Sequence, residues 1–204
     1  MARVSDSFLK QYATVPFGQY GKVCVVVVDM INGFVKEGAL ADPAIMEIIP
    51  SIETLLKQGG DCVFVADTHE PNALEFRSYP PHCLKGSEES EIVAPLQPYV
   101  KTKLTKNSTC TFTSPNWQAY YAAHQNDYDT FVIVGCCTDI CILQFALTLR
   151  AYLNEKQIDQ RVVVPISMID TYHIDQVHDA YACNAFAIAN MAGNAVEVVK
   201  DFTY

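Results

Sequence analysis

Short, uninterrupted runs of β-branched and other apolar residues constrain the fold of this chain most strongly. Three of them occupy residues 23–28, 62–66 and 130–134. Runs of this length without alternating polar residues are typical of strands buried on both faces, as in parallel sheets. Residues 161–166 form a fourth such run, and residues 195–199 are expected to form a last strand.

Segments with helical spacing of apolar residues lie between these strands. Helices are predicted over residues 49–57, 115–125, 138–154 and 175–192, and residues 91–99 form a loop or short helix. Ser114 and Thr138 are the expected N-caps of the second and third helices. Because strands alternate with helices, we predict one domain over residues 1–204 with a three-layer α/β/α architecture and a mostly parallel sheet. Residues 1–21 form an N-terminal arm.

The charge of the chain limits its partners. The formal net charge is −9, so no basic face is offered to nucleic acid, and anionic membranes are repelled. No apolar run approaches the roughly 20 residues that span a bilayer. Residues 1–21 lack the apolar centre of a signal peptide. We therefore expect a cytoplasmic protein whose eight cysteines are reduced, with neither nucleic acid nor membrane as partner.

The residues that follow the predicted strands carry reactive side chains. The first run is followed by Asp29, the second by Asp67 and His69, and the third leads through Gly135 to Cys141. Sites in open α/β sheets form beyond the carboxyl ends of the strands. Cys141 falls in the first turn of a helix, where the partial positive charge favours a thiolate. From position alone, Cys141 is as readily a small core residue.

A second group of residues suits a metal ion. Asp67 and His69 are two positions apart at a strand end, so they point the same way. Glu75 and His82 follow in a long loop over residues 68–90, and loops of this length are usually functional. Two imidazoles, one carboxylate and an optional second carboxylate suit Zn, Mn or Fe. We expect one divalent ion, zinc, with Glu75 as the least secure ligand.

The pattern Gly135-x-x-Thr138-x-x-Cys141 after a buried strand resembles the signature of the isochorismatase-like cysteine hydrolases. The resemblance implies that Cys141 is the nucleophile. It also implies a cis peptide bond between Cys136 and Cys137, with Cys136 beside the substrate. The backbone N–H groups of Cys137 and Cys141 would then form the oxyanion hole.

The same resemblance implies two further catalytic residues. The pattern from Asp29 to Phe34 is similar to the D-x-x-x-x-F segment of the family, which makes Asp29 the general base and places Phe34 against the substrate. The stretch over residues 106–112 resembles the family's lysine segment, and its spacing indicates Lys106 as the catalytic lysine, with Lys103 as the alternative. Without the resemblance, Asp29 could be a turn former and the lysines solvated charges.

The metal segment resembles that of the nicotinamidases within this group. Asp67-x-His69 is followed by a P-x-H-x-x-x-G pattern that contains His82, and Glu75 precedes His82 by seven positions. The resemblance implies that these residues hold the metal and that Tyr79 lies at the substrate.

What the resemblance implies is hydrolysis of nicotinamide to nicotinic acid and ammonia through a thioester on Cys141. The metal would position the aromatic amide, and a homo-oligomer (dimer or tetramer) is expected. Three alternatives stay open: an amidase of the same fold acting on another small amide or carbamoyl compound, a metal-hydroxide hydrolase in which Cys141 is a bystander, and a non-catalytic ligand-binding member of the fold.

Overall fold

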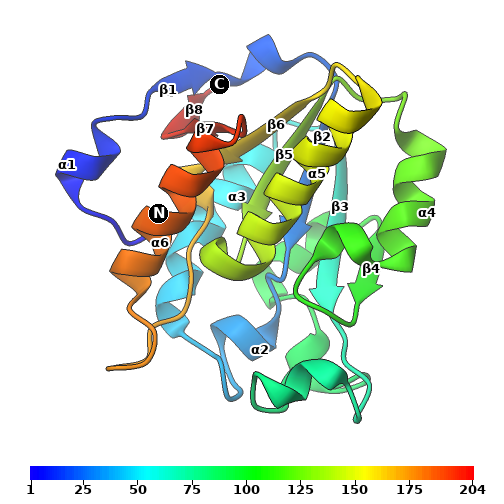
Figure 1. The fold of residues 1–204 in the computed structure, drawn as a ribbon, viewed down its shortest axis with the longest axis vertical. Helices are drawn as coiled ribbons and strands as arrows, with labels where there is room; N and C mark the ends of the chain where they lie inside the picture. The colour runs from blue at the N-terminus through cyan, green and yellow to red at the C-terminus, as the bar shows by residue number, and fades with distance from the viewer.

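A six-stranded, entirely parallel sheet forms the centre of the computed structural model, which describes all residues 1–204 (Figure 1). The strand order is β4-β3-β2-β5-β6-β7. The bounds are β2 Val23–Val28, β3 Asp61–Asp67, β4 Lys103–Lys106, β5 Thr130–Gly135, β6 Arg161–Pro165 and β7 Glu197–Val199. The sheet confirms the predicted α/β class.

Helices cover both faces of this sheet and complete three layers (Figure 1). One face packs against α2 (Asn32–Val35) and α3 (Ile49–Leu56). The other packs against α4 (Pro115–His124), α5 (Leu143–Lys156) and α6 (Ala180–Gly193). None of the helices is both long and apolar enough to cross a bilayer.

The central strand shows why its sequence has no polar alternation. Val25 and Val27 of β2 belong to the 28-residue core cluster under α2 and α3. Cys24, Val26 and Val28 belong to the 25-residue cluster under α4, α5 and α6. Successive side chains of a strand point to opposite faces, so a strand covered on both sides needs apolar residues throughout.

The arm over residues 1–21 packs on the body of its own chain. It contains α1 (Asp6–Leu9) and β1 (Thr14–Pro16), and β1 pairs in parallel with β8 (Asp201–Thr203). The Arg3 guanidinium forms ion pairs of 2.7 Å with Asp42 and 3.0 Å with Asp170. Shorter 3-10 helices span Phe17–Tyr20, Pro43–Ile48, Leu74–Arg77, Glu88–Ser90, Ala94–Tyr99, Thr111–Thr113 and Ile166–Met168.

Neither predicted capping residue makes a side-chain cap hydrogen bond. Ser114 occupies the N-cap position of α4, as predicted, but its hydroxyl donates a 2.9 Å hydrogen bond to the Thr105 carbonyl. The helix after β5 begins as a π-helix, Thr138–Ile142 (η7), before α5, and Cys137 occupies its N-cap position. The Thr138 hydroxyl is buried without a hydrogen-bond partner, so the predicted N-cap at Thr138 was wrong.

Two other boundaries differ from the sequence expectation. β4 was not predicted, because Lys103 and Lys106 interrupt its apolar pattern; charged edge strands are common in sheets. The last helix begins at Ala180 and not near residue 175. Asp179 provides its N-cap by accepting a 2.9 Å hydrogen bond from the Tyr181 N–H.

Candidate active site

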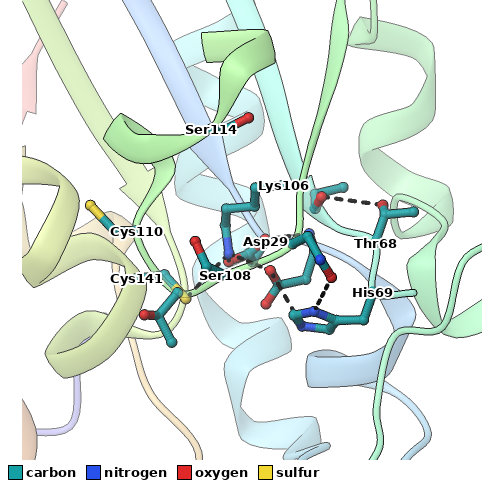
Figure 2. A network of polar contacts seen from close by, with 12 residues as sticks. Asp29, Thr68, His69, Lys106, Ser108, Cys110, Ser114 and Cys141 are labelled. Atoms are coloured by element: carbon teal, nitrogen blue, oxygen red, sulfur yellow. Dashed lines mark hydrogen bonds and ion pairs between the residues drawn. The ribbon is translucent and has the colours of Figure 1, made fainter. Parts of the chain in front are cut away.

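Four neighbouring strands bring one polar group each to the carboxyl edge of the sheet. Asp29 follows β2, Asp67 ends β3, Lys106 ends β4, and Cys141 lies in η7 after β5. Asp67 and Lys106 are direct partners in the β3–β4 register. Figure 2 shows the Lys106 side chain reaching toward Asp29 and Cys141, with His69 at the other end of the polar network. The four groups come together because parallel strands end at one edge.

The Lys106 ammonium is the centre of this network. Its Nζ lies 2.6 Å from Asp67 Oδ1, 2.8 Å from Asp29 Oδ2 and 3.6 Å from Cys141 Sγ. Burial alone would lower the pKa of Lys106, but Asp29 and Asp67 outweigh it and raise that pKa well above its usual value. Lys103 lies elsewhere, 3.0 Å from the exposed Glu91 carboxylate. The structure therefore places Lys106, and not Lys103, beside the thiol.

Asp29 is fixed by its own backbone. It has a φ of 52°, in the left-handed region, and its N–H donates a 2.8 Å hydrogen bond to the Val65 carbonyl. Its Oδ1 accepts a 2.8 Å hydrogen bond from the Asp67 N–H, which leaves Oδ2 toward Lys106. Burial, and then the Asp67 carboxylate, raise the pKa of Asp29 to about 6 against the opposing effect of Lys106. A carboxylate of this basicity suits a general base.

The thiol of Cys141 holds its proton in this environment. Burial raises the pKa of Cys141 well above its usual value; Lys106 opposes this rise, and Asp29 and Asp67 add to it. The position of Cys141 in the first turn of a helix predicted a lowered pKa; the pKa is raised instead, because burial outweighs the effect of Lys106. Asp29 has a carboxylate oxygen within 4.8 Å of Cys141 Sγ, so a base lies near the thiol.

The turn between β5 and η7 depends on a close backbone approach. Gly135 has a φ of +113°, and a Cβ there would lie 2.0 Å from the Val28 carbonyl oxygen. The peptide bond between Cys136 and Cys137 is cis, as the resemblance implied. The Cys136 Sγ is buried and donates a 3.0 Å hydrogen bond to the Asp29 carbonyl, so Cys136 does not line the pocket.

The four predicted metal ligands converge beside this network. Ligand atoms of Asp67, His69, Glu75 and His82 all lie within 4.8 Å of one another. His69 Nε2 is 3.6 Å from Asp67 Oδ1 and 3.7 Å from Glu75 Oε1. His82 Nε2 is 3.9 Å from Asp67 Oδ2. Glu75, the ligand least secure by sequence, is thus within the group.

The histidines are oriented as metal ligands usually are. The Pro80 carbonyl can only accept, so His82 Nδ1 donates the 2.8 Å hydrogen bond between them. His69 Nδ1 lies 3.1 Å from Asn107 Oδ1, an atom that also accepts from the Glu70 N–H. Both Nε2 atoms are therefore free to face the site, and His69 Nε2 is buried without any hydrogen bond. This donor set and its unpartnered atom fit a divalent cation.

A narrow pocket leads to the thiol and the metal donors. Its lining contains the polar residues Asp67, Glu75 and His82 together with Cys137 and Cys141. The remaining lining residues are mostly apolar or aromatic: Phe34, Leu40, Tyr79, Thr109, Ile140 and Tyr172. A small planar molecule with one polar end matches such a lining.

The sequence of this chain matches the model of a known protein family. Residues 23–164 match the model of the isochorismatase domain, a span that covers the strands from β2 to β6 and all four groups of the network. The chain belongs to the isochorismatase family.

Individual proteins are also similar to this chain. Nicotinamidase 1 of Arabidopsis thaliana is 28% identical over 155 residues, which cover 65% of this chain and 62% of that protein. The chain thus matches less than two thirds of that relative. The N-carbamoylsarcosine amidase of Thermoplasma acidophilum is 27% identical, with a TM-score of 0.65 over 87% of this chain and 95% of the other. The pyrazinamidase of Pyrococcus horikoshii, solved in complex with zinc, is 20% identical, with a TM-score of 0.69 over 87% and 98%.

Some pocket residues of this isochorismatase-family chain escaped the sequence analysis. Phe34 and Tyr79 lie in the pocket, where they were expected. Ile140 was overlooked although it lies inside the nucleophile motif. Tyr172 follows β6 closely, and its position near a strand end was the only signal for it. Thr109, whose N–H donates a 2.9 Å hydrogen bond to Glu75 Oε2, lies at an unspecified position of the lysine segment, so the motif gave no signal for it.

Proposed function

We propose that this chain is a metal-assisted cysteine amidohydrolase that converts nicotinamide to nicotinic acid and ammonia. One observation carries the proposal: the Lys106 ammonium contacts two buried carboxylates and the Cys141 thiol, while a group of metal donors faces the same pocket. The similarity to a nicotinamidase supports this substrate class. The similarity to a pyrazinamidase that was solved with zinc supports zinc as the metal.

The first half of the reaction forms a thioester. Asp29 takes the proton from Cys141 Sγ, and the thiolate attacks the carboxamide carbon. Lys106 stabilises the negative charge on sulfur. The oxygen that becomes negative is held by backbone N–H groups near Cys137, whose own N–H donates to no acceptor within the chain. Asp29 then returns its proton to the nitrogen, the C–N bond breaks, and ammonia leaves.

The second half releases the acid. A water molecule gives a proton to Asp29 as its oxygen attacks the thioester carbon. The C–S bond then breaks, the proton on Asp29 returns to the sulfur, and Cys141 regains its thiol as the carboxylic acid departs. Each proton that Asp29 accepts is passed on, so the cycle leaves the site unchanged.

Orientation of the substrate would come from the pocket walls and the metal donors. Asp67, His69, Glu75 and His82 would hold the ion, which when bound supplies a Lewis-acid anchor for a basic ring nitrogen. The aromatic rings of Phe34, Tyr79 and Tyr172 line the pocket and offer faces for a planar ring. Correct orientation removes several kcal/mol from such a barrier.

A second candidate is an amidase for a small carbamoyl compound. The similarity to an N-carbamoylsarcosine amidase favours it, since that enzyme shares the fold and 27% of the aligned residues. It would use Cys141, Asp29 and Lys106 in the same way. The candidates differ in their need for an aromatic ring, which a comparison of turnover on nicotinamide and N-carbamoylsarcosine measures directly.

The decisive experiment measures ammonia release from nicotinamide by zinc-loaded protein, with Cys141→Ala as the paired variant. Release by the parent and none by the variant supports the proposal. Turnover that survives in the variant points to a metal-hydroxide hydrolase. No turnover of nicotinamide or any other small amide points to a non-catalytic member of the fold.

The proposal extends to compartment and assembly. All eight cysteines are free, as expected in a reducing cytoplasm where pyridine nucleotides are salvaged. We propose a homo-oligomer of two or four copies, for which the exposed apolar residues Val177, Tyr181 and Phe186, beside or on α6, are candidate contact residues. Light scattering on the purified protein measures the number of copies.

A further inference from the structure

A second cluster of metal-binding side chains lies on the other side of the pocket wall. Asp139 comes from η7, His178 from the loop before α6, and Cys183 from α6 itself. Their ligand atoms all lie within 4.8 Å of one another. None of them belongs to the Asp67 group, and the proposed reaction uses none of them.

The contacts of His178 define the chemistry of this cluster. His178 Nδ1 lies 2.8 Å from the Tyr172 carbonyl oxygen, which can only accept, so Nδ1 carries a hydrogen. Nε2 lies 2.8 Å from Asp139 Oδ2. In a neutral ring, a lone pair on Nε2 would then face a carboxylate. Something positive must therefore lie between Nε2 and Asp139, either a proton or a metal ion.

Two further observations favour the metal ion over the proton. Asp139 Oδ1 is buried without any hydrogen-bond partner. Cys183 adds a sulfur donor to the same group. A proton shared by Nε2 and Oδ2 would leave Oδ1 without a partner, whereas a metal ion would take all three side chains as ligands. A backbone carbonyl that accepts from the second ring nitrogen, as Tyr172 does here, is the usual partner of a metal-binding histidine.

We propose that Asp139, His178 and Cys183 form a second site for a divalent cation of the zinc type, with an open fourth position. The carboxylate, imidazole and thiolate set suits zinc. A Cys-His-Asp catalytic triad does not fit the same residues, since both nitrogens of His178 are engaged and neither can take the Cys183 proton.

The geometry needs only a small adjustment. A tetrahedral ion with bonds of about 2.0–2.3 Å holds its ligand atoms about 3.3–3.6 Å apart. The His178–Asp139 contact must open by about half an ångström, and Cys183 must move inward by up to about one ångström. The side chains of His178 and Asp139 are 14% and 12% exposed, so an ion can reach them. As it binds, the Cys183 proton leaves to solvent.

The site would fix one wall of the active-site pocket. The His178 ring stacks on the Tyr172 ring, with centroids 4.2 Å apart and an angle of 26° between planes. Tyr172 lines the pocket. An ion on His178 thus holds Tyr172 in place without touching substrate. The site stands or falls independently of the amidase proposal, because its ligands take no part in the reaction.

Cobalt distinguishes the two sites by their ligands. The Asp67 group offers only nitrogen and oxygen, whereas a thiolate on cobalt gives an intense charge-transfer absorption. We would titrate metal-free Cys141→Ser protein with Co²⁺, so that the nucleophile adds no thiolate. The expected result is two bound ions per chain together with the thiolate band. His82→Ala in this background keeps the band and loses one ion.

Cys183→Ser is the deciding variant. It should abolish the thiolate band and reduce the bound ions from two to one, with an unchanged far-UV circular dichroism spectrum. His178→Gln, which keeps an amide donor toward Tyr172, should weaken cobalt binding at this site at least tenfold. Absence of the band from the background protein overturns the proposal, as does a band that survives Cys183→Ser.

Discussion

At the scale of single residues, one ammonium group contacts both buried carboxylates of the site. Lys106 is buried between Asp29 and Asp67, and it also contacts the sulfur of Cys141. Without it, two carboxylates would lie side by side in a low dielectric, where unpaired charges cost several kcal/mol. We therefore expect both the stability of the fold and the proposed reaction to depend on Lys106.

Replacing Lys106 with alanine should lower both activity and stability. We expect amidase kcat/KM to fall by about 10³-fold or more, and the free energy of unfolding by about 3–5 kcal/mol, since removing one partner leaves buried charges uncompensated. Lys103→Ala is the matched control, and it should stay within about 0.5 kcal/mol of the parent with full activity. Urea denaturation and ammonia release measure the two effects. A larger loss of activity and stability in Lys103→Ala than in Lys106→Ala would contradict the site described here.

Asn107 should control metal affinity without binding the metal. Its Oδ1 accepts from His69 Nδ1 and so directs Nε2 into the site. Loss of such a supporting contact typically weakens metal binding about 10–100-fold. Asn107→Ala should show this loss of zinc affinity in a competition titration with a chelator. Asn126→Ala, in an exposed turn, should bind zinc like the parent.

At the scale of elements, the turn after β5 has the tightest steric requirement at the site. Gly135→Ala would place a Cβ 2.0 Å from the Val28 carbonyl, a backbone atom of the neighbouring strand that cannot move aside. We expect a loss above about 4 kcal/mol or failure to fold, measured by urea denaturation or soluble yield. Gly59→Ala, also at positive φ but with no atom within 4 Å, should lose only about 1 kcal/mol. Equal losses would mean that backbone conformation alone matters.

The elements also show what a sequence can and cannot predict. β2 was predicted at its observed bounds because a strand covered on both faces needs an unbroken apolar run. β4 was not predicted because Lys103 and Lys106 interrupt the apolar pattern by which a strand is recognised. Site residues carried by motifs, such as His82 and Cys141, were predicted from the resemblance, and the structure brings both to one pocket. Thr109 was missed because irregular loops reach the pocket only through the three-dimensional path of the chain.

At the scale of the whole molecule, the Arg3 side chain helps to join the N-terminal arm to the active edge. Arg3 pairs with Asp170, whose side chain is only 2% exposed, and with Asp42. The Asp170 carbonyl in turn accepts a 3.1 Å hydrogen bond from the Thr138 N–H in the nucleophile motif. The arm therefore supports the turn that carries Cys141.

Removing this side chain should destabilise the protein. Arg3→Ala leaves the Asp170 carboxylate buried without its cation, at a cost of about 2–3 kcal/mol. Lys10→Ala, an exposed position in the same arm, should be nearly neutral. The midpoint of urea unfolding measures both. An Arg3→Ala protein as stable as the parent would show that the arm contributes nothing through this contact.

The parallel pairing of every strand in the main sheet also governs how the chain folds. No pair can form as a hairpin, since parallel neighbours need a long crossover, and contacts between distant segments slow folding to the order of milliseconds to seconds. The four polar groups of the proposed site lie in or just after four different strands, so they meet only after these long-range pairings exist. During refolding, amidase activity should therefore never return before the fluorescence of the buried Trp117. The proposed activity should therefore be a late event of folding, and no fragment that lacks one of those strands should show any.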